Sequence, residues 1–393
     1  MTLRVLVTDE IDPEGVQLLQ AQPELLVDEV PTLPKQELLS RIGDYDAIVG
    51  RSATKISEEL LRAAKRLKVV GRAGVGVDNI ALDAATALGI AVINAPAGNT
   101  VAVAELFFGV MIGLLRHLPH ATRSMRDGKW DRSQLLGSEL KGRTLGIVGV
   151  GRIGGEIATR AQAFCMEVVG FDPYIADDRF RALRVRRAAT LDALLEEADI
   201  VTVHTPLNDE TKGLISRREI ALMRAGGIVA NLARGGIVDD QALMAALDSG
   251  HLRGAALDVY QSEPLAADHP IRQAPNVVLT PHIGASTAEA QRNVAVDVCR
   301  SVRDALLHGE LSRSINVASV SLGDGRWREV QPAMLVAQRA AMVTRAILAD
   351  QGLRAVRRLS VRYPSPSAPT TYPHRDRLSA LTEGSCGILD GIS

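Results

Sequence analysis

The chain has 393 residues, and at about 150 residues per domain this length predicts two or three domains. The 45 Lys and Arg residues balance 46 Asp and Glu residues to a formal charge of −1 without a polybasic block, so we expect neither nucleic acid nor a membrane as partner. Three scattered cysteines, Cys165, Cys299 and Cys386, exclude a disulfide framework and a cysteine-ligated zinc site, and they favour a reducing, cytoplasmic compartment.

Short β-branched runs alternate with helical patterns in the first part of the chain. Strands are expected at residues 3–8, 47–50, 69–70 and 91–94, and helices at 13–20 and 57–65. Strands that alternate with helices predict parallel βαβ units, with helices on both faces of a sheet. Residues 1–10 lack the basic start and the apolar stretch of a signal peptide.

Residues 101–118 are expected to form one long, mostly apolar helix. Their longest apolar run, residues 106–115, is much shorter than the ~20 residues that a membrane-spanning helix needs. We therefore expect a buried core helix.

A second series of βαβ units begins at Thr144. Strands are expected at 144–148, 167–171, 200–204, 228–231, 254–258 and 277–280, and helices at 153–163 and 191–198. A further helix is expected at 286–307 and returns to the first domain.

We predict an α/β fold with two doubly wound parallel sheets. The substrate domain would comprise residues 1–99 and 286–313, and the cofactor domain residues 100–285. Residues 314–393 form an extension with a helix at 331–349, a strand at 355–362 and a proline-rich segment at 364–373.

Gly149, Gly151 and Gly154 form a GxGxxG motif between an apolar strand and a helix. In that context the first glycine permits a tight turn, the second lets the backbone approach a pyrophosphate, and the third lets the helix pack on the strand. The helix N-terminus offers N–H groups to the phosphates. Asp172 ends the next strand, where a carboxylate would bind the ribose hydroxyls and repel a 2′-phosphate, so we predict NAD rather than NADP.

Three polar segments follow predicted strands: NLARGG at 231–236, DVYQSEP at 258–264 and PHIGA at 281–285. Ligands of open α/β sheets bind at the carboxyl ends of the strands, so we expect Arg234, Glu263 and His282 around one site. Reduction of a 2-oxo acid by hydride produces an alkoxide that His282 can protonate, while Glu263 stabilises the protonated imidazole. Arg234 would bind the substrate carboxylate through two hydrogen bonds and polarise the carbonyl. Each residue alone is commonly structural, but together, after a dinucleotide turn, they predict catalysis.

These segments together resemble the D-isomer-specific 2-hydroxyacid dehydrogenases. The resemblance covers residues 3–318 and includes GRAGVGVDNI at 71–80, NAPAGNT at 94–100 and WDR at 130–132, which are similar to the family members that oxidise phosphoglycerate. It implies a Rossmann-type cofactor domain and a flavodoxin-like substrate or lid domain, with NAD as cofactor. It also implies a homodimer or homotetramer built largely from the cofactor domains, with Trp130 near the interface. We expect no metal.

Residue-by-residue matching to the family assigns catalysis to Arg234, Glu263 and His282. Besides the three glycines and Asp172, the resemblance implies that the NAD site is lined by Val75, Arg152, Ile153, Thr205, Leu232, Ala233, Asp258, His282, Ile283, Gly284 and Ala285. The residues expected at the substrate are Arg51, Ser52, Arg72, Gly74, Val75, Arg234 and His282.

The expected reaction is the oxidation of 3-phosphoglycerate to 3-phosphohydroxypyruvate, the first step of serine biosynthesis. The forked guanidiniums of Arg51 and Arg72 suit a phosphate, although both could instead be loop arginines that face solvent, and Arg132 could come from a partner subunit. The alternative enzyme is a glyoxylate or hydroxypyruvate reductase, or another D-2-hydroxyacid dehydrogenase, with the same three catalytic residues. A more remote alternative is an NAD(H)-sensing corepressor that works through protein partners.

The C-terminal part differs from the long members of the family. Residues 314–362 resemble the start of the intervening domain of those members, and the residues up to 393 leave no room for a serine-binding ACT domain. We therefore expect no feedback inhibition by serine through such a domain.

Overall fold

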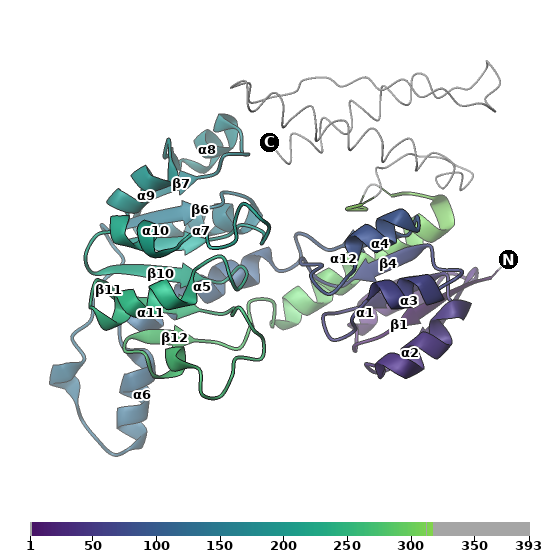
Figure 1. Ribbon diagram of the computed structural model, residues 1–393, viewed down its shortest axis with the longest axis horizontal. Coiled ribbons are helices and arrows are strands. Elements are labelled where there is room, and N and C mark those ends of the chain that lie inside the picture. Colours follow the sequence, from purple (N-terminus) through teal and green to yellow (C-terminus); the bar gives the residue numbers. More distant parts are fainter. Residues whose placement is uncertain (1, 312, 317–393) are drawn as a thin grey trace. The chain divides into compact units, whose positions relative to one another are not determined.

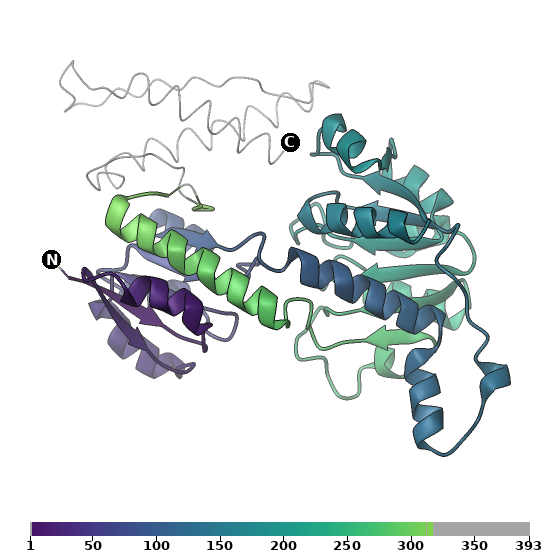
Figure 2. The ribbon, with the colours of Figure 1, turned by 180° about the vertical axis from the view of Figure 1, so that it is seen from behind.

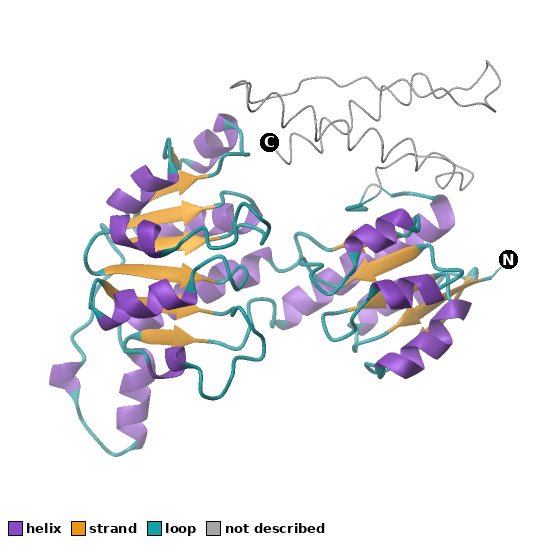
Figure 3. Cartoon of the chain, viewed as in Figure 1, coloured by secondary structure: helices purple, strands orange, loops and turns teal. Residues whose placement is uncertain are grey.

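The computed structural model describes residues 2–311 and 313–316, and these form two units. One unit joins Met1–Asn99 to the chain from Ala288 on, and the other is Thr100–Thr287. Each unit holds one parallel sheet with helices along it (Figures 1 and 3), which confirms the predicted fold class. The helix, strand and proline-rich segment expected after residue 316 lie outside the described residues, as does Cys386.

The first unit has a five-stranded sheet in the order β2-β1-β3-β4-β5, the order of flavodoxin-like folds. Its strands are β1 (Leu3–Val7), β2 (Leu25–Glu29), β3 (Ala47–Gly50), β4 (Val69–Arg72) and β5 (Ala91–Asn94). Its helices are α1 (Pro13–Gln20), α2 (Lys35–Arg41), α3 (Glu58–Ala63), α4 (Leu82–Ala87) and α12 (Ala288–His308), with a short 3-10 helix at Ile42–Asp44. Strand β2 and helices α2 and α4 were not predicted from the sequence, and β2 is an edge strand with only one buried residue.

Alternate residues of a strand face opposite sides of a sheet, and both sides are covered in this unit. Val5 and Val7 pack in a core with α1 and α12, whereas Leu6 packs in the core formed with α2, α3 and α4. Helices α1 and α12 approach so closely that a Cβ at Gly15 would lie 2.6 Å from the carbonyl carbon of Ala295. Helix α12 runs along this sheet in Figure 2 and completes the unit.

The second unit has a seven-stranded sheet in the order β12-β11-β10-β9-β6-β7-β8. The chain order is that of a Rossmann fold, with β6 as the first strand, extended by one further strand at β12. The strands are β6 (Thr144–Val148), β7 (Glu167–Phe171), β8 (Arg186–Arg187), β9 (Ile200–Val203), β10 (Gly227–Asn231), β11 (Leu252–Leu257) and β12 (Val277–Leu279). The helices are α5 (Thr100–Leu115), α6 (Leu118–Arg126), α7 (Arg152–Ala163), α8 (Asp177–Leu183), α9 (Leu191–Glu197), α10 (Arg217–Leu222) and α11 (Asp240–Asp248), with short 3-10 helices at Arg132–Gln134 and Pro270–Gln273.

The expectation of one helix over residues 101–118 was wrong at its C-terminal end. Helix α5 ends at Leu115, and α6 starts at Leu118 after His117, whose φ of 53° is left-handed. The cause is Pro119, whose ring removes an N–H donor and collides with the preceding turn of a continuous helix. No single helix among the described residues is long and apolar enough to cross a membrane. Helices α5 and α6 are long and apolar enough only when taken together, but the chain bends by 62° between them. Most of α5 is packed in a hydrophobic core.

Candidate active site

The predicted cofactor and catalytic residues of the second unit follow the carboxyl ends of its strands. The glycine turn follows β6, Asp172 follows β7 and Thr205 follows shortly after β9. Arg234, Glu263 and His282 come from the segments after β10, β11 and β12, which are neighbours in the sheet. The sheet therefore gathers most of the predicted residues at one edge.

The GxGxxG turn needs glycine at two positions for different steric reasons. Gly149 has a φ of 95°, and a Cβ there would lie 2.7 Å from the carbonyl oxygen of His204. A Cβ at Gly154 would lie 2.1 Å from the carbonyl oxygen of Gly149, so only glycine lets α7 start against the turn. A Cβ at Gly151 would meet no atom within 4 Å, so this face of the turn is open to a ligand.

Several features of the turn fit a dinucleotide. No side chain caps the first turn of α7, a helix of 12 residues, so its N-terminus is suited to an anion. Asp172 accepts a hydrogen bond from the Val150 N–H (2.9 Å) and another from the Tyr174 N–H (3.0 Å), which tie the carboxylate to the glycine turn. A carboxylate has about four acceptor sites, so capacity remains for the ribose hydroxyls. The buried hydroxyl oxygen of Thr205 has no hydrogen-bond partner among the described residues, which also fits a ligand contact.

His204, beside Thr205, is a half-buried polar side chain that was not singled out from the sequence. Its Nε2 lies 2.8 Å from the Thr202 hydroxyl, and its ring packs edge-on against Phe107. Burial lowers the pKa of His204 from 6.5 to about 3, so the ring is neutral at physiological pH.

Asn231 shapes the loop that carries Arg234. Its side chain is buried, donates to the carbonyl oxygen of Arg234 (2.8 Å) and accepts from the N–H of Ala233 (3.1 Å). The Arg234 guanidinium in turn donates to the Ala233 carbonyl oxygen (2.6 Å). A Cβ at Gly235 would lie 1.8 Å from the carbonyl oxygen of Tyr260, so glycine is required where the loops after β10 and β11 meet.

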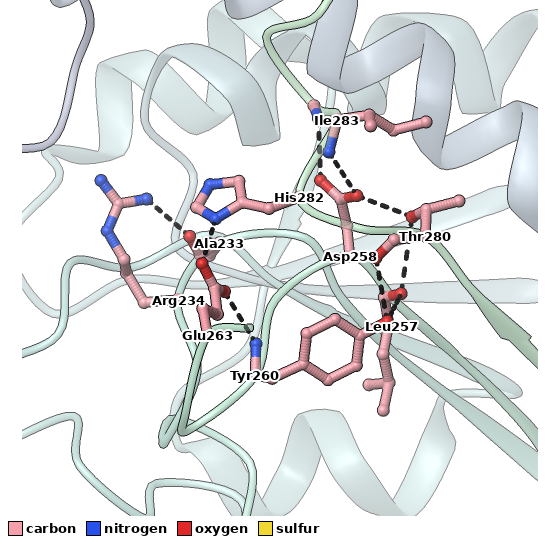
Figure 4. Close-up of polar contacts among 10 residues, drawn as sticks. Ala233, Arg234, Leu257, Asp258, Tyr260, Glu263, Thr280, His282 and Ile283 are labelled. Carbon is pink, nitrogen blue, oxygen red and sulfur yellow. Dashed lines mark hydrogen bonds and ion pairs between the residues drawn. The ribbon is translucent and has the colours of Figure 1, made fainter. Parts of the chain in front are cut away.

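His282 and Glu263 form a direct pair. The distance from His282 Nδ1 to Glu263 Oε2 is 2.6 Å, and the other carboxylate oxygen of Glu263 accepts from the Tyr260 N–H at 3.0 Å (Figure 4). Burial raises the pKa of the Tyr260 phenol to about 12, so its hydroxyl stays protonated, and its single hydrogen is shared between the carbonyl oxygens of Thr280 (2.9 Å) and Leu257 (3.2 Å). The pair therefore rests on a loop that is anchored to two strands.

Asp258 holds the turn that contains His282. Its buried carboxylate accepts from the Thr280 hydroxyl (2.6 Å) and from the backbone N–H groups of Ile283 and Gly284 (both 2.8 Å). These bonds fix a turn in which His282 has a left-handed φ of 54°. Asp258 was predicted at the cofactor. In this structure its described contacts are internal, and a role at NAD stays a prediction.

The remaining predicted cofactor positions lie on the same loops, with one exception. Arg152 and Ile153 start α7, Leu232 and Ala233 precede Arg234, and residues 283–285 follow His282. Val75 belongs to the first unit, in the segment after β4.

In the first unit, Arg51 and Arg72 line one small cavity. Strands β3 and β4 pair with Gly50 opposite Arg72, so Arg51 follows directly beside it. Gly74 gives Arg72 room, since a Cβ there would lie 1.4 Å from an Arg72 guanidinium nitrogen. Ser52 is exposed in the same loop as Arg51, and Arg132, in the second unit, begins a short 3-10 helix.

Comparison with known proteins identifies the family. The model of the NAD binding domain of the D-isomer specific 2-hydroxyacid dehydrogenases matches residues 108–284. A glyoxylate reductase from Paecilomyes thermophila, in its crystal structure, is 30% identical with a TM-score of 0.73, over 80% of this chain and 98% of that one. This chain belongs to the D-isomer specific 2-hydroxyacid dehydrogenases. The TT0316 protein from Thermus thermophilus is similar to this dehydrogenase at 38% identity and a TM-score of 0.71, over 77% of this chain and 97% of that one.

Longer relatives match as well. The D-3-phosphoglycerate dehydrogenase of Bacillus subtilis is 48% identical over 301 residues, which are 76% of this chain and 56% of the relative. This 2-hydroxyacid dehydrogenase therefore spans little more than half the length of that relative. The part of this chain that matches the NAD binding domain, residues 108–284, contains the glycine turn, Arg234, Glu263 and His282.

Proposed function

We propose that this dehydrogenase oxidises 3-phosphoglycerate to 3-phosphohydroxypyruvate with NAD, the first step of serine biosynthesis. The observation that carries the proposal is the 2.6 Å pair of His282 and Glu263, in the same sheet-edge cluster as Arg234. Several relatives named D-3-phosphoglycerate dehydrogenase, at 41–48% identity, support the choice of substrate.

The chain's own groups supply the acid–base chemistry. When bound, NAD supplies the hydride acceptor. His282 Nε2 takes the proton of the substrate 2-hydroxyl while the hydride leaves C2, and in the reverse direction it returns that proton to the alkoxide. Glu263, on Nδ1, keeps the accepting nitrogen at Nε2 and stabilises the imidazolium that forms. Arg234 binds the substrate carboxylate and polarises the 2-oxo group.

The substrate phosphate is assigned to Arg51 and Arg72. Both line one cavity of the first unit, and two guanidiniums match a dianion better than a neutral hydroxymethyl group. Ser52 and Gly74 accompany them in the same two loops.

The assembly that we propose is a homodimer or homotetramer in the cytoplasm. Large apolar side chains are exposed along α6 and the segment after it: Leu118 (49%), Met125 (56%), Trp130 (78%) and Leu136 (87%). Exposed large apolar side chains concentrated in one segment support an interface with a second copy. The free cysteines among the described residues, Cys165 and Cys299, fit a reducing compartment.

The test is NADH oxidation by the purified protein with 3-phosphohydroxypyruvate, hydroxypyruvate and glyoxylate side by side. We expect the phosphorylated substrate to lead by at least about 100-fold in kcat/KM, equivalent to about 2.7 kcal/mol. Arg72→Ala should reduce kcat/KM for that substrate far more than for hydroxypyruvate, whereas equal losses would remove the phosphate assignment.

A glyoxylate or hydroxypyruvate reductase is the second candidate. The likeness to a glyoxylate reductase over almost the whole of that chain favours it. If hydroxypyruvate or glyoxylate matches the phosphorylated substrate in kcat/KM, this second candidate replaces the first.

A further inference from the structure

One buried carboxylate holds the loop that carries Arg51. Asp9 follows β1, is 7% exposed and has a left-handed φ of 65°. One of its oxygens accepts from the backbone N–H groups of Arg51 (2.8 Å) and Thr54 (3.0 Å). The other accepts from the hydroxyls of Thr54 (2.6 Å) and Thr32 (2.8 Å). The carboxylate therefore has four donors, which is about its full capacity.

An amide holds the same loop through its carbonyl groups. The Asn79 side-chain nitrogen donates to the carbonyl oxygens of Arg51 (3.0 Å) and Thr54 (2.7 Å). The N–H and the C=O of both residues are thus bound, by a side chain from the end of β1 and by another from the segment after β4. Ser52 and Ala53, between the two held residues, are exposed.

Close packing leaves this loop little freedom at its start. A Cβ at Gly50 would lie 2.6 Å from the Thr8 hydroxyl and 3.4 Å from the Asp9 carboxylate. The Thr54 side chain is buried and also bonds the Thr8 hydroxyl at 3.1 Å. A fully satisfied buried polar network rigidifies the segment that it joins.

The held loop borders the cavity that Arg72 also lines, and Asn79 contributes to the wall of that cavity. Because its backbone is held, the Arg51 side chain starts from a fixed position beside Arg72, so a phosphate would not have to order the loop when it binds.

We propose that Asp9 and Asn79 are positioning residues, which clamp the Arg51–Thr54 loop so that Arg51 and Arg72 recognise a phosphorylated substrate. This inference rests on the proposed function. It adds two residues that act on substrate affinity through the backbone of the loop that they hold.

Two variants test the clamp with different risks to folding. In Asp9→Asn the amide oxygen can face the two backbone N–H groups, because the two threonine hydroxyls can rotate to accept from the amide nitrogen. The variant keeps the shape of the network but loses the charge, so the bonds that hold the Arg51 and Thr54 N–H groups become neutral and weaker. Asn79→Ala removes both donors to the loop carbonyls and leaves Asp9 unchanged.

Asp46→Asn is the matched control. Asp46 is a buried carboxylate just before β3, at the other end of that strand, where it accepts from the Arg4 N–H (3.0 Å) and pairs with Arg66 (2.9 Å) and Lys68 (3.2 Å). Its replacement should lower stability without moving the Arg51 loop.

Steady-state kinetics with saturating NADH give the functional readout. We expect Asp9→Asn and Asn79→Ala to raise KM for 3-phosphohydroxypyruvate by about 10-fold to 100-fold, while kcat and the KM for hydroxypyruvate change less than about threefold. Asp46→Asn should leave all of these values within about twofold. The positioning role would be overturned if KM rose equally for both substrates, or if KM for 3-phosphohydroxypyruvate rose in neither variant.

Hydrogen exchange of the backbone amides in residues 51–54, measured on the unliganded protein, gives a readout that needs no substrate. We expect faster exchange in both clamp variants and wild-type exchange in Asp46→Asn. Unchanged exchange in both clamp variants refutes the clamp. If exchange is faster in both clamp variants but the wild type does not act on 3-phosphohydroxypyruvate, the clamp stands and the proposed function is refuted.

Discussion

Glu263→Gln is the most informative change at the candidate active site, because the glutamate accepts two hydrogen bonds at once and a glutamine has only one oxygen to accept with. Its carboxylate receives the Tyr260 N–H at 3.0 Å on one oxygen and faces His282 Nδ1 at 2.6 Å with the other. A glutamine can turn its oxygen to only one of them. If it keeps the Tyr260 bond, its amide donates to Nδ1, and the ring proton is then held on Nε2, where the substrate proton has to arrive.

The magnitude follows from the two bonds. A charge-assisted hydrogen bond contributes about 1.5–3 kcal/mol and a neutral one about 0.5–1.5 kcal/mol, so the substitution costs about 1–1.5 kcal/mol at the imidazolium. Preference for the wrong tautomer adds about 1 kcal/mol, the scale of one neutral hydrogen bond. Because the side chains of His282 and Glu263 are 48% and 36% exposed, water competes for both groups and limits the loss. We expect kcat for oxidation of the hydroxy acid to fall about 10-fold to 100-fold, less than the ~10²–10⁴-fold typical of losing the base itself.

The assay is the initial rate of NADH formation, combined with NADH binding followed by fluorescence. NADH affinity should stay within about twofold, because the substitution leaves the glycine turn and Asp172 unchanged. Glu196→Gln, an exposed position on α9 of the same unit, is the control and should retain wild-type kcat. If Glu263→Gln keeps kcat within threefold of wild type, the carboxylate does not control the tautomer of His282.

Three further changes test other parts of the second unit. Asp172→Ala should raise kcat/KM with NADP relative to NAD by about tenfold or more, since a carboxylate that repels the 2′-phosphate is lost; an unchanged ratio would show that Asp172 does not contact the ribose. Gly235→Ala should lower the free energy of unfolding by about 1–3 kcal/mol in urea titrations and abolish most activity, because its Cβ would lie 1.8 Å from the Tyr260 carbonyl oxygen; wild-type stability would contradict that packing. His204 has a folded pKa of about 3, below its ordinary 6.5, so its stabilising contribution is present above pH 6.5 and is lost as the pH falls toward 3. Between pH 7 and pH 5 the wild type should lose about 2 kcal/mol more than His204→Gln does, and equal losses would show that the ring is protonated in the folded state.

The sheet edge, and the grouping of the candidate side chains along it, could be predicted from the sequence because their signals are local. Arg234, Glu263 and His282 each stand a few residues after an apolar run, within segments rich in glycine or proline, and parallel strands bring such segments to one edge. The GxGxxG turn is likewise defined locally, by its spacing and by the apolar strand and the helix on either side of it. Its steric reasons appear in the structure as the contacts of Gly149 and Gly154.

The supporting residues could not be predicted in the same way, since their partners are distant in sequence. Asp9 is separated by 42 and 45 positions from the N–H groups that it accepts, and Asp258 by 25 and 26. A single buried carboxylate leaves no periodic pattern, so only the folded chain shows which loop it holds. The break between α5 and α6 is different, because Pro119 was visible in the sequence and should have ended the predicted helix.

Because the first unit is discontinuous in sequence, the two units cannot fold in chain order while the ribosome synthesises the protein. Strands β1 to β5 emerge first, but the face that holds Val5 and Val7 is completed only by α12, made after the whole of Thr100–Thr287. The contiguous second unit has all its strands available before the first unit can close, so the later segment can fold before the earlier one is finished. Until α12 is made, the nascent chain carries an apolar sheet face that α1 alone covers in part, which is the kind of surface that chaperones bind and that leads to aggregation. A circular permutant that begins at Thr100 would make each unit continuous along the chain and remove that interval.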